Sequence, residues 1–132
     1  MSNSEEKVEV KKSTNAVIDG VAYRVNVWPA TKSISYLNRL LAACGENAIP
    51  FIEGSFDFSS ILRVTKLTSN STLLDLIQEA VCSAYREGSR LDSKTFNSDF
   101  KDLLHIYKVF GWVCEVQYAD FFEQGMSMNV VD

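Results

Sequence analysis

The segment from Phe96 to Gln124 constrains the fold most strongly, because its apolar residues follow helical spacing on more than one face. One stripe has the i, i+3, i+4, i+7 spacing of an α-helix, and its members are Phe100, Leu103, Leu104, Tyr107, Gly111, Cys114, Tyr118 and Phe122. A second apolar stripe consists of Ile106, Val109, Val113 and Val116. A helix that is apolar nearly all round needs cover on most sides. We therefore predict one long C-terminal helix that is enclosed either by the rest of the fold or by a partner molecule.

The sequence before Pro29 predicts a β-hairpin. Asp19-Gly20 is a dipeptide that readily supplies the positive φ angles of a tight hairpin turn, and it separates Ala16–Ile18 from Val21–Trp28. On the second strand, apolar residues alternate with mainly polar ones, which gives the strand one apolar face. These apolar residues are Val21, Tyr23, Val25 and Val27. We expect this face to pack against helices.

An amphipathic helix is predicted directly after the hairpin. Thr31 or Ser33 can cap its first turn, and Gly45 is expected to end it. The expected apolar face is Ile34, Leu37, Leu40, Leu41 and Cys44. The next segment, Glu46–Leu67, is less regular and is interpreted as a loop plus a short helix.

A further helix is predicted from a cap at Asn70, Ser71 or Thr72 to a stop at Gly88. Its expected buried stripe is Leu73, Leu74, Ile77, Val81 and Ala84. Ser89–Asp99 is then interpreted as a polar connector. The predicted fold class is α+β, mainly α, with an N-terminal β-hairpin packed on about four helices, the last of them long.

A length of 132 residues suits one domain, and we see no internal repeat. Residues 1–15 are polar and are predicted to form a flexible arm. Residues 16–125 are predicted to form a single globular domain. Gly125 is expected to end the last helix, which would leave residues 126–132 as a short C-terminal tail.

Composition and charge exclude several classes of protein. A net charge of −4 and a pI near 5.0 argue against a nucleic-acid binder, which needs clustered Lys and Arg. The longest apolar run of the C-terminal segment, Val109–Cys114, is too short to span a membrane. The polar N-terminus lacks the apolar core of a secretory signal, so we expect a cytosolic protein. The three cysteines, Cys44, Cys82 and Cys114, are expected to be free core thiols.

No catalytic, cofactor or metal site is predicted. The single histidine, His105, has no second histidine or Cys-x-x-Cys pair near it, and we expect it to be a partly exposed helix residue. Cys114 lies nine residues after His105, about 13–14 Å along the same helix, which is too far for the two to form a Cys/His nucleophilic dyad. A small enzyme whose acids or His105 meet only in the fold is one alternative. A concave polar pocket with several convergent titratable groups would favour it.

Four aromatic residues crowd the end of the last predicted helix: Trp112, Tyr118, Phe121 and Phe122. They can serve as core packing or as a hydrophobic docking site. Phe121 and Phe122 are adjacent and so point about 100° apart on a helix, which prevents both from facing one narrow seam.

Two segments resemble the small tail assembly chaperones of long-tailed bacteriophages. The first is Tyr23-Arg-Val-Asn-Val-Trp-Pro-Ala-Thr-Lys32, a strand that ends in a Pro-Ala step before the helix from Ile34 to Cys44. The second is Phe96-Asn-Ser-Asp-Phe100, followed by Leu103 to Val116 and by Gln117-Tyr-Ala-Asp-Phe-Phe122. It is similar to the C-terminal helix of the same group, with its Trp and its final Asp-Phe-Phe.

The resemblance implies a protein that binds the long, largely helical tape measure protein and keeps it soluble while the tail tube polymerises. It implies action in the host cell cytoplasm and departure before the virion is complete. Further implied partners are a frameshifted longer form of the chain, the tail tube protein and a second copy of the chain. The open sides of the last helix, including Trp112, Tyr118, Phe121 and Phe122, are expected to be the partner surface.

The alternative within phage assembly is a small structural tail or connector protein that is retained in the virion. Such a protein would self-assemble through an extended interface. It would be present in purified particles, so particle composition separates the two possibilities.

Overall fold

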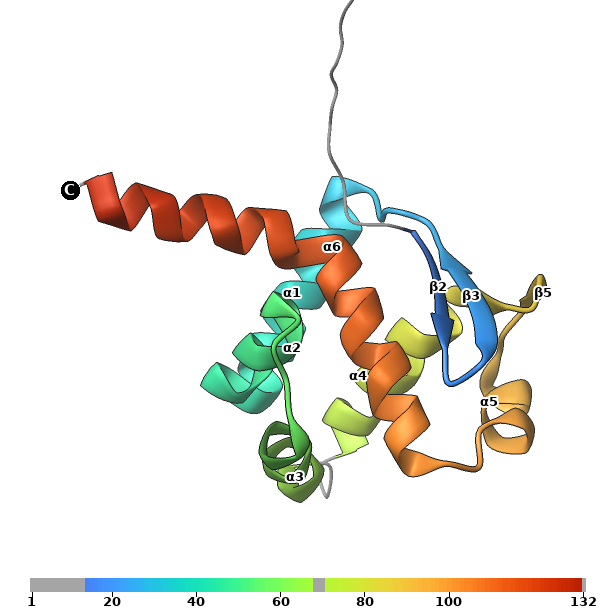
Figure 1. Cartoon of the computed structure of the whole chain (residues 1–132). Coiled ribbons are helices and arrows are strands. Elements are labelled where there is room, and N and C mark those ends of the chain that lie inside the picture. Colours follow the sequence, from blue (N-terminus) through green and yellow to red (C-terminus); the bar gives the residue numbers. More distant parts are fainter. Residues whose placement is uncertain (1–13, 68–70, 132) are drawn as a thin grey trace, which may run out of the picture.

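The computed structural model describes residues 14–67 and 71–131, and Figure 1 shows the arrangement of its elements. Within these residues the chain forms six α-helices, one 3-10 helix (η2) and a four-stranded sheet. In chain order they are β2 (Asn15–Ile18), β3 (Val21–Val25), α1 (Ala30–Cys44), η2 (Gly45–Ala48), α2 (Ile49–Glu53), α3 (Phe58–Leu67), α4 (Ser71–Cys82), β4 (Ala84–Arg86), β5 (Ser89–Arg90), α5 (Ser93–Asp99) and α6 (Leu103–Val131). The α+β, mainly helical fold class is confirmed. Residues 1–13 of the predicted arm and the predicted cap Asn70 lie outside the described residues.

The N-terminal hairpin is confirmed, with positive φ angles of 51° at Asp19 and 83° at Gly20 in its turn. Its second strand ends at Val25, however, and not at Trp28. The Gln117 side chain of α6 explains this, because it accepts a hydrogen bond from the Trp28 N–H and donates one to the Asn26 carbonyl, both at 2.9 Å. The alternation therefore breaks: Val27 is 56% exposed, while the Trp28 ring is buried.

The predicted helix of residues 70–88 is wrong in its second half. Helix α4 ends at Cys82, and the chain then forms the hairpin β4–β5, which extends the sheet in the order β2-β3-β4-β5. Ala84 lies opposite Val25, and Arg86 opposite Tyr23. Hydrogen bonding to the open edge of β3 thus overrides the local helical pattern. Gly88 lies in the turn of this hairpin and does not end a helix.

The predicted polar connector Ser89–Asp99 is also structured, as β5 and α5. Asp92 caps α5: its carboxylate accepts hydrogen bonds from the backbone N–H groups of Lys94 and Thr95, at 3.0 and 2.9 Å. The Thr95 hydroxyl and the Asp92 N–H lie 2.8 Å apart and complete a reciprocal capping box. By contrast, α1 begins after Pro29 without the side-chain cap expected from Thr31 or Ser33.

The last helix is long, as predicted, but it begins later and ends later than expected. Phe96 belongs to α5, and the chain turns at Phe100–Asp102 before α6 begins at Leu103. The Asp102 carboxylate accepts a hydrogen bond from the Leu104 N–H at 3.0 Å, which satisfies a free donor of the first turn. At the other end, Gly125 lacks the positive φ that ends many helices, and α6 continues to Val131.

The first half of α6 lies at the centre of the molecule, with α1, α2, α4 and the sheet around it (Figure 1). Its buried residues occupy several faces of the helix: Tyr107, Val109, Phe110, Val113, Cys114, Tyr118 and Ala119. The rest of the fold therefore supplies the cover that the apolar pattern requires. Cys44 and Cys114 are buried and Cys82 is half-buried, all as free thiols. Burial raises the pKa of the Cys44 thiol to about 11.

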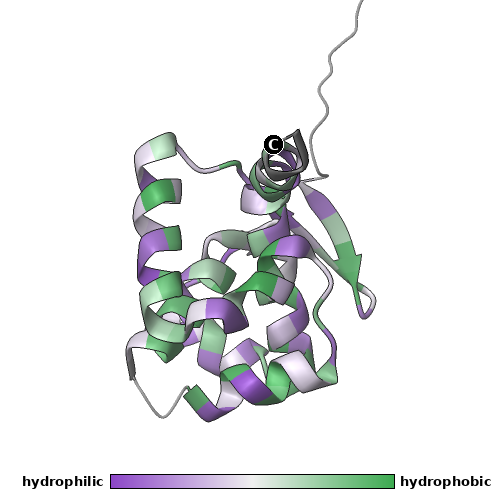
Figure 2. Ribbon diagram, turned by 90° about the vertical axis from the view of Figure 1, so that its left-hand side faces the viewer, coloured by the Kyte–Doolittle hydropathy of each residue, from purple (hydrophilic) through white to green (hydrophobic). Residues whose placement is uncertain are grey.

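The second half of α6 projects beyond the other helices (Figure 1). Figure 2 looks onto the side of the molecule from which it projects, with the C-terminal end toward the viewer. Phe121, Met126 and Met128 on this part are exposed. The projecting half thus leaves apolar side chains in solvent, as the first turn of α6 also does at Leu103 and Leu104.

Candidate partner-binding surface

The structure separates the four aromatic residues that the sequence singled out. Tyr118 is buried, and its hydroxyl donates a hydrogen bond to the Ser33 carbonyl of α1 at 2.8 Å. Trp112 is partly buried and packs on the sheet side of α6, with its ring 6.3 Å from that of Tyr23. Phe121 is 60% exposed, and Phe122 is partly buried with its ring 6.1 Å from that of Phe121. They do not form a single exposed patch, and their role in binding a partner stays a prediction.

Phe121 and Phe122 point to different sides of α6, as their adjacency predicted. Phe121 borders a mainly apolar hollow of about 220 Å³ between α1 and α6, which is lined by Ala30, Ser33, Ile34, Leu37, Gln117, Tyr118 and Phe121. Phe122 borders a second hollow of about 500 Å³ with Glu53, Ala119, Glu123, Met126 and Ser127. A third, of about 210 Å³, is formed by Phe121, Phe122, Gly125 and Met126. The third hollow joins the other two around α6, because it shares Phe121 with the first and Phe122 and Met126 with the second.

We call Ile34, Leu37, Phe121, Phe122 and Met126, which line these hollows, the C-terminal apolar surface. Ile34 was expected on the buried face of its helix, but it is 70% exposed. Leu40 and Cys44 of the predicted face are buried, but Tyr36 takes the buried position in the first half of α1. Met126 was assigned to a tail. The continued helical spacing of Phe121, Phe122 and Met126 is a sequence signal that could have placed it on the helix.

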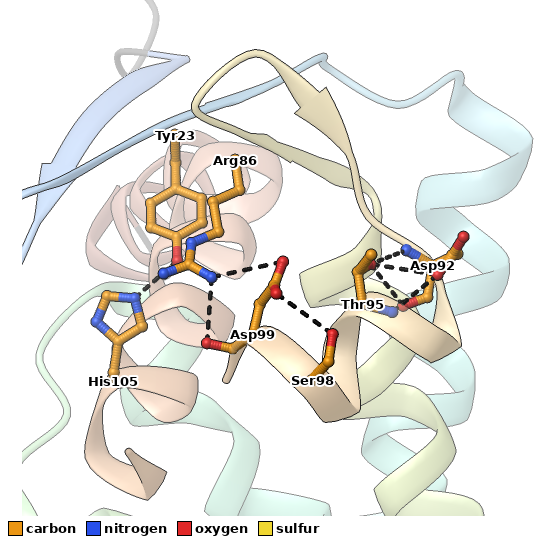
Figure 3. A network of polar contacts seen from close by, with 7 residues as sticks. All are labelled: Tyr23, Arg86, Asp92, Thr95, Ser98, Asp99 and His105. Atoms are coloured by element: carbon orange, nitrogen blue, oxygen red, sulfur yellow. Dashed lines mark hydrogen bonds and ion pairs between the residues drawn. The ribbon is translucent and has the colours of Figure 1, made fainter. Parts of the chain in front are cut away.

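A second candidate site is a polar pocket of about 360 Å³ beside the hairpin turn. Figure 3 shows three residues of its lining, Arg86, Asp99 and His105. It is lined by Asp19, Val21, Arg86, Asp99, Phe100, Lys101, Asp102 and His105. The prediction that His105 is partly exposed is wrong, since its ring is buried between the hairpin and α5. The Nε2 atom lies 2.7 Å from the Tyr23 hydroxyl, and Nδ1 lies 3.0 Å from the Asp19 carboxylate. These partners come from the hairpin, which helical spacing alone could not place there.

Two charge pairs lie at this pocket, Asp19 with His105 and Arg86 with Asp99. Asp19 also accepts a hydrogen bond from the Lys108 ammonium at 2.9 Å, and Lys108 and then His105 lower the pKa of the Asp19 carboxyl. The Arg86 guanidinium donates to the Asp99 carbonyl at 3.1 Å and lies over the Phe100 ring. Since a carboxylate only accepts, Nδ1–H of His105 donates to Asp19, and the other ring nitrogen, Nε2, forms the hydrogen bond with the Tyr23 hydroxyl.

Burial raises the pKa of Tyr23 to about 12, so its hydroxyl stays protonated. The described residues include no group of three or more His, Cys, Asp or Glu side chains that could hold a metal ion. The contacts join the hairpin turn to α6, and β4 to the end of α5. This arrangement is that of a structural polar network, which favours the C-terminal apolar surface as the functional site.

Comparison with known proteins gives one family. The family model described as "Phage tail assembly chaperone protein, TAC" matches residues 19–129, from the hairpin turn to the projecting end of α6. No curated protein and no solved structure matches the chain. Among the described residues, no helix has the length and apolar character needed to cross a membrane.

Proposed function

This chain belongs to the phage tail assembly chaperone family, and from that premise we propose that it binds the tape measure protein and keeps it soluble while the tail tube polymerises. The observation that carries the proposal is the C-terminal apolar surface, on which Ile34 is 70% and Phe121 60% exposed. Contiguous apolar side chains in solvent mark a site for a partner. The tape measure protein, which the family resemblance implies to be long and largely helical, offers apolar helix faces that need such cover.

The mode of binding is a helix laid into a groove. Apolar side chains of the partner would enter the hollow between α1 and α6, with Tyr118 as part of its lining, and the hollows beside Phe122. Each apolar side chain removed from water contributes about 1.5–3 kcal/mol before the entropic cost of association. Trp112 packs on Tyr23 and is not part of the proposed surface. The role is binding alone, without catalysis.

The wider setting belongs to the same proposal. The chain acts in the host cytoplasm and leaves before the virion is complete. A frameshifted longer form and the tail tube protein are further partners implied by the family. The net charge of −4 supports this role, because charge of one sign helps to keep a complex with an apolar partner in solution.

Co-expression with the tape measure protein encoded in the same genome tests the proposal. We expect the two proteins to co-purify by affinity tag and to elute as one soluble complex in size-exclusion chromatography with light scattering. A Phe121→Ser variant should lose the complex, because it removes the exposed ring between two hollows.

The matched control is Phe58→Ser on α3, which removes an equally exposed ring, 66% against 60%, far from the C-terminal part of α6. It should keep the complex. Far-UV circular dichroism should show that both variants fold. A tape measure protein that stays insoluble beside the wild-type chain would refute the proposal, and unchanged binding by Phe121→Ser would refute the choice of surface.

A further inference from the structure

We propose that the segment held by the C-terminal apolar surface is an amphipathic helix whose apolar face is bordered by Lys or Arg. This inference rests on the proposed function and specifies the chemistry of the bound segment. It follows from the shape of the surface and from the sign of the charges around it.

The surface is long enough to be a site for a helix. Its three hollows are lined from Ser127 back to Gln117 of α6, a span of about 15 Å at 1.5 Å per residue. This is long enough for apolar residues at positions i, i+4 and i+7 of a bound helix. Gly125 lines the third hollow, where no atom within 4 Å would contact an added Cβ, so a backbone can approach closely there.

The border of the surface is acidic. Glu53 of α2 and Glu123 of α6 line the same hollow, and Asp120 is exposed on α6 three residues before Glu123. No Lys or Arg lines any of the three hollows, and none occurs in the sequence from Val109 to Val131.

Ion pairs within the described residues do not neutralise these acids. In the part of the chain that the structure describes, no ion pair involves Glu53, Asp120 or Glu123. The C-terminal end of α6 adds partial negative charge, and no basic residue in the last turn offsets it. A bound helix therefore meets an apolar surface inside a negative field, and Lys or Arg beside its apolar face is the matching chemistry.

The same charges argue against a second copy of the chain on this surface. In a symmetric pair the same patch meets itself. Glu53, Asp120 and Glu123 of one copy would then face those of the other, and like charges placed together oppose association. The negative charge of the surface attracts a basic helix, whereas it repels a second copy of the chain.

Three fluorescein-labelled synthetic helices test the inference. Each has about 18 residues and the same Leu and Met face, and the positions that border this face are Lys, Gln or Glu. Fluorescence anisotropy with the full chain should show the Lys peptide binding at least about tenfold more tightly than the Glu peptide. Its advantage should shrink when salt rises from about 0.05 M to about 0.5 M.

Charge-neutral variants locate the effect. Asp120→Asn/Glu123→Gln should reduce the preference for the Lys peptide. The control Asp75→Asn/Glu87→Gln, which makes the same change of net charge on α4 and in the β4–β5 turn, should not. Phe121→Ser should weaken binding of the Lys peptide.

Equal binding of the three peptides would overturn the basic-helix inference while leaving apolar docking in place. Binding of the Lys peptide that survives Phe121→Ser would overturn it as well, because the peptide would then bind elsewhere. A dimer of the chain that Phe121→Ser dissociates would identify a second copy as the occupant and overturn it too. The proposed function fails separately, by an insoluble tape measure protein in the co-expression experiment.

Discussion

Asp19 connects the turn of the N-terminal hairpin to α6. Its carboxylate accepts from the Lys108 ammonium at 2.9 Å and lies 3.0 Å from His105 Nδ1. The residue also has a φ of 51°, which Asn and Asp tolerate better than most residues. Its two roles, turn conformation and ion pairing, can therefore be separated by replacing it with Asn.

The Asp19 ion pairs predict a pH-dependent contribution to stability. Lys108, and then His105, lower the pKa of Asp19 in the folded state. A carboxyl with a lowered folded pKa stabilises the protein above its unfolded pKa of about 3.9, and this stabilisation is lost as pH falls through the folded value. We therefore expect Asp19→Asn to be less stable than the wild type near pH 6, and the difference to vanish at lower pH. Urea unfolding at both pH values measures it.

Comparing the wild type with Asp19→Asn separates the contribution of Asp19 to stability from that of the other acids. The pKa values of Asp57 and Asp92 are also lowered, by hydrogen bonds at helix starts, but both proteins share these groups. In a Lys108→Gln background, which removes the largest cause of the shift, Asp19→Asn should change stability less. A constant difference between wild type and Asp19→Asn down to low pH would contradict the assignment.

Among the elements, α6 passes from an enclosed half to a projecting half, and the space around its two glycines shows the difference. A Cβ at Gly111 would lie 2.3 Å from the Phe56 ring, which itself stacks on Phe51 at 4.8 Å. A Cβ at Gly125 would meet nothing within 4 Å. The same substitution therefore tests the enclosed half of one helix against its projecting half.

We expect Gly111→Ala to destabilise the protein and Gly125→Ala to stabilise it. Overpacking costs about 1–3 kcal/mol, which exceeds the roughly 0.5–1 kcal/mol that Ala gains over Gly inside a helix. At Gly125 only the gain remains, because the added methyl group clashes with nothing. Chemical unfolding of the two variants measures both signs. A Gly111→Ala protein as stable as the wild type would show that Phe56 moves aside without cost.

On the scale of the whole molecule, every α-helix and the central strands contribute to one hydrophobic core. Buried members from successive elements include Val25, Leu40, Ile52, Val64, Val81, Ala84, Phe96 and Val113. Trp28 lies near Tyr36 and Tyr118, and Trp112 near Tyr23, so the two tryptophans report on different sides of this core.

One contiguous core predicts a single cooperative unfolding transition. We expect urea unfolding curves from far-UV circular dichroism and from tryptophan fluorescence to coincide. The variants Trp28→Phe and Trp112→Phe each leave one tryptophan. For each variant, we expect fluorescence and circular dichroism to give the same unfolding curve. Transitions at separate urea concentrations would show that the sheet and the helices unfold as independent units.

The sequence by itself determined the features that depend on neighbours along the chain. Asp19-Gly20 specifies a turn through its positive φ angles, and the apolar residues on several faces of Val109–Tyr118 require an enclosed helix. The family resemblance rests on residues 23–32 and 96–122, and the family comparison agrees with it. These predictions succeeded because turn chemistry and helical spacing act over a few residues.

Only the tertiary structure decided the features that depend on distant partners. Ala84 forms a strand because β3 presents an open edge to it, and His105 is buried because Tyr23 and Asp19 reach it from the hairpin. Likewise Tyr118 is buried where its hydroxyl reaches Ser33 of α1, while Phe121 is exposed at the border of the hollow between α1 and α6. Burial and long-range hydrogen bonds compete with local preference, and their outcome is set by where separate elements meet in space.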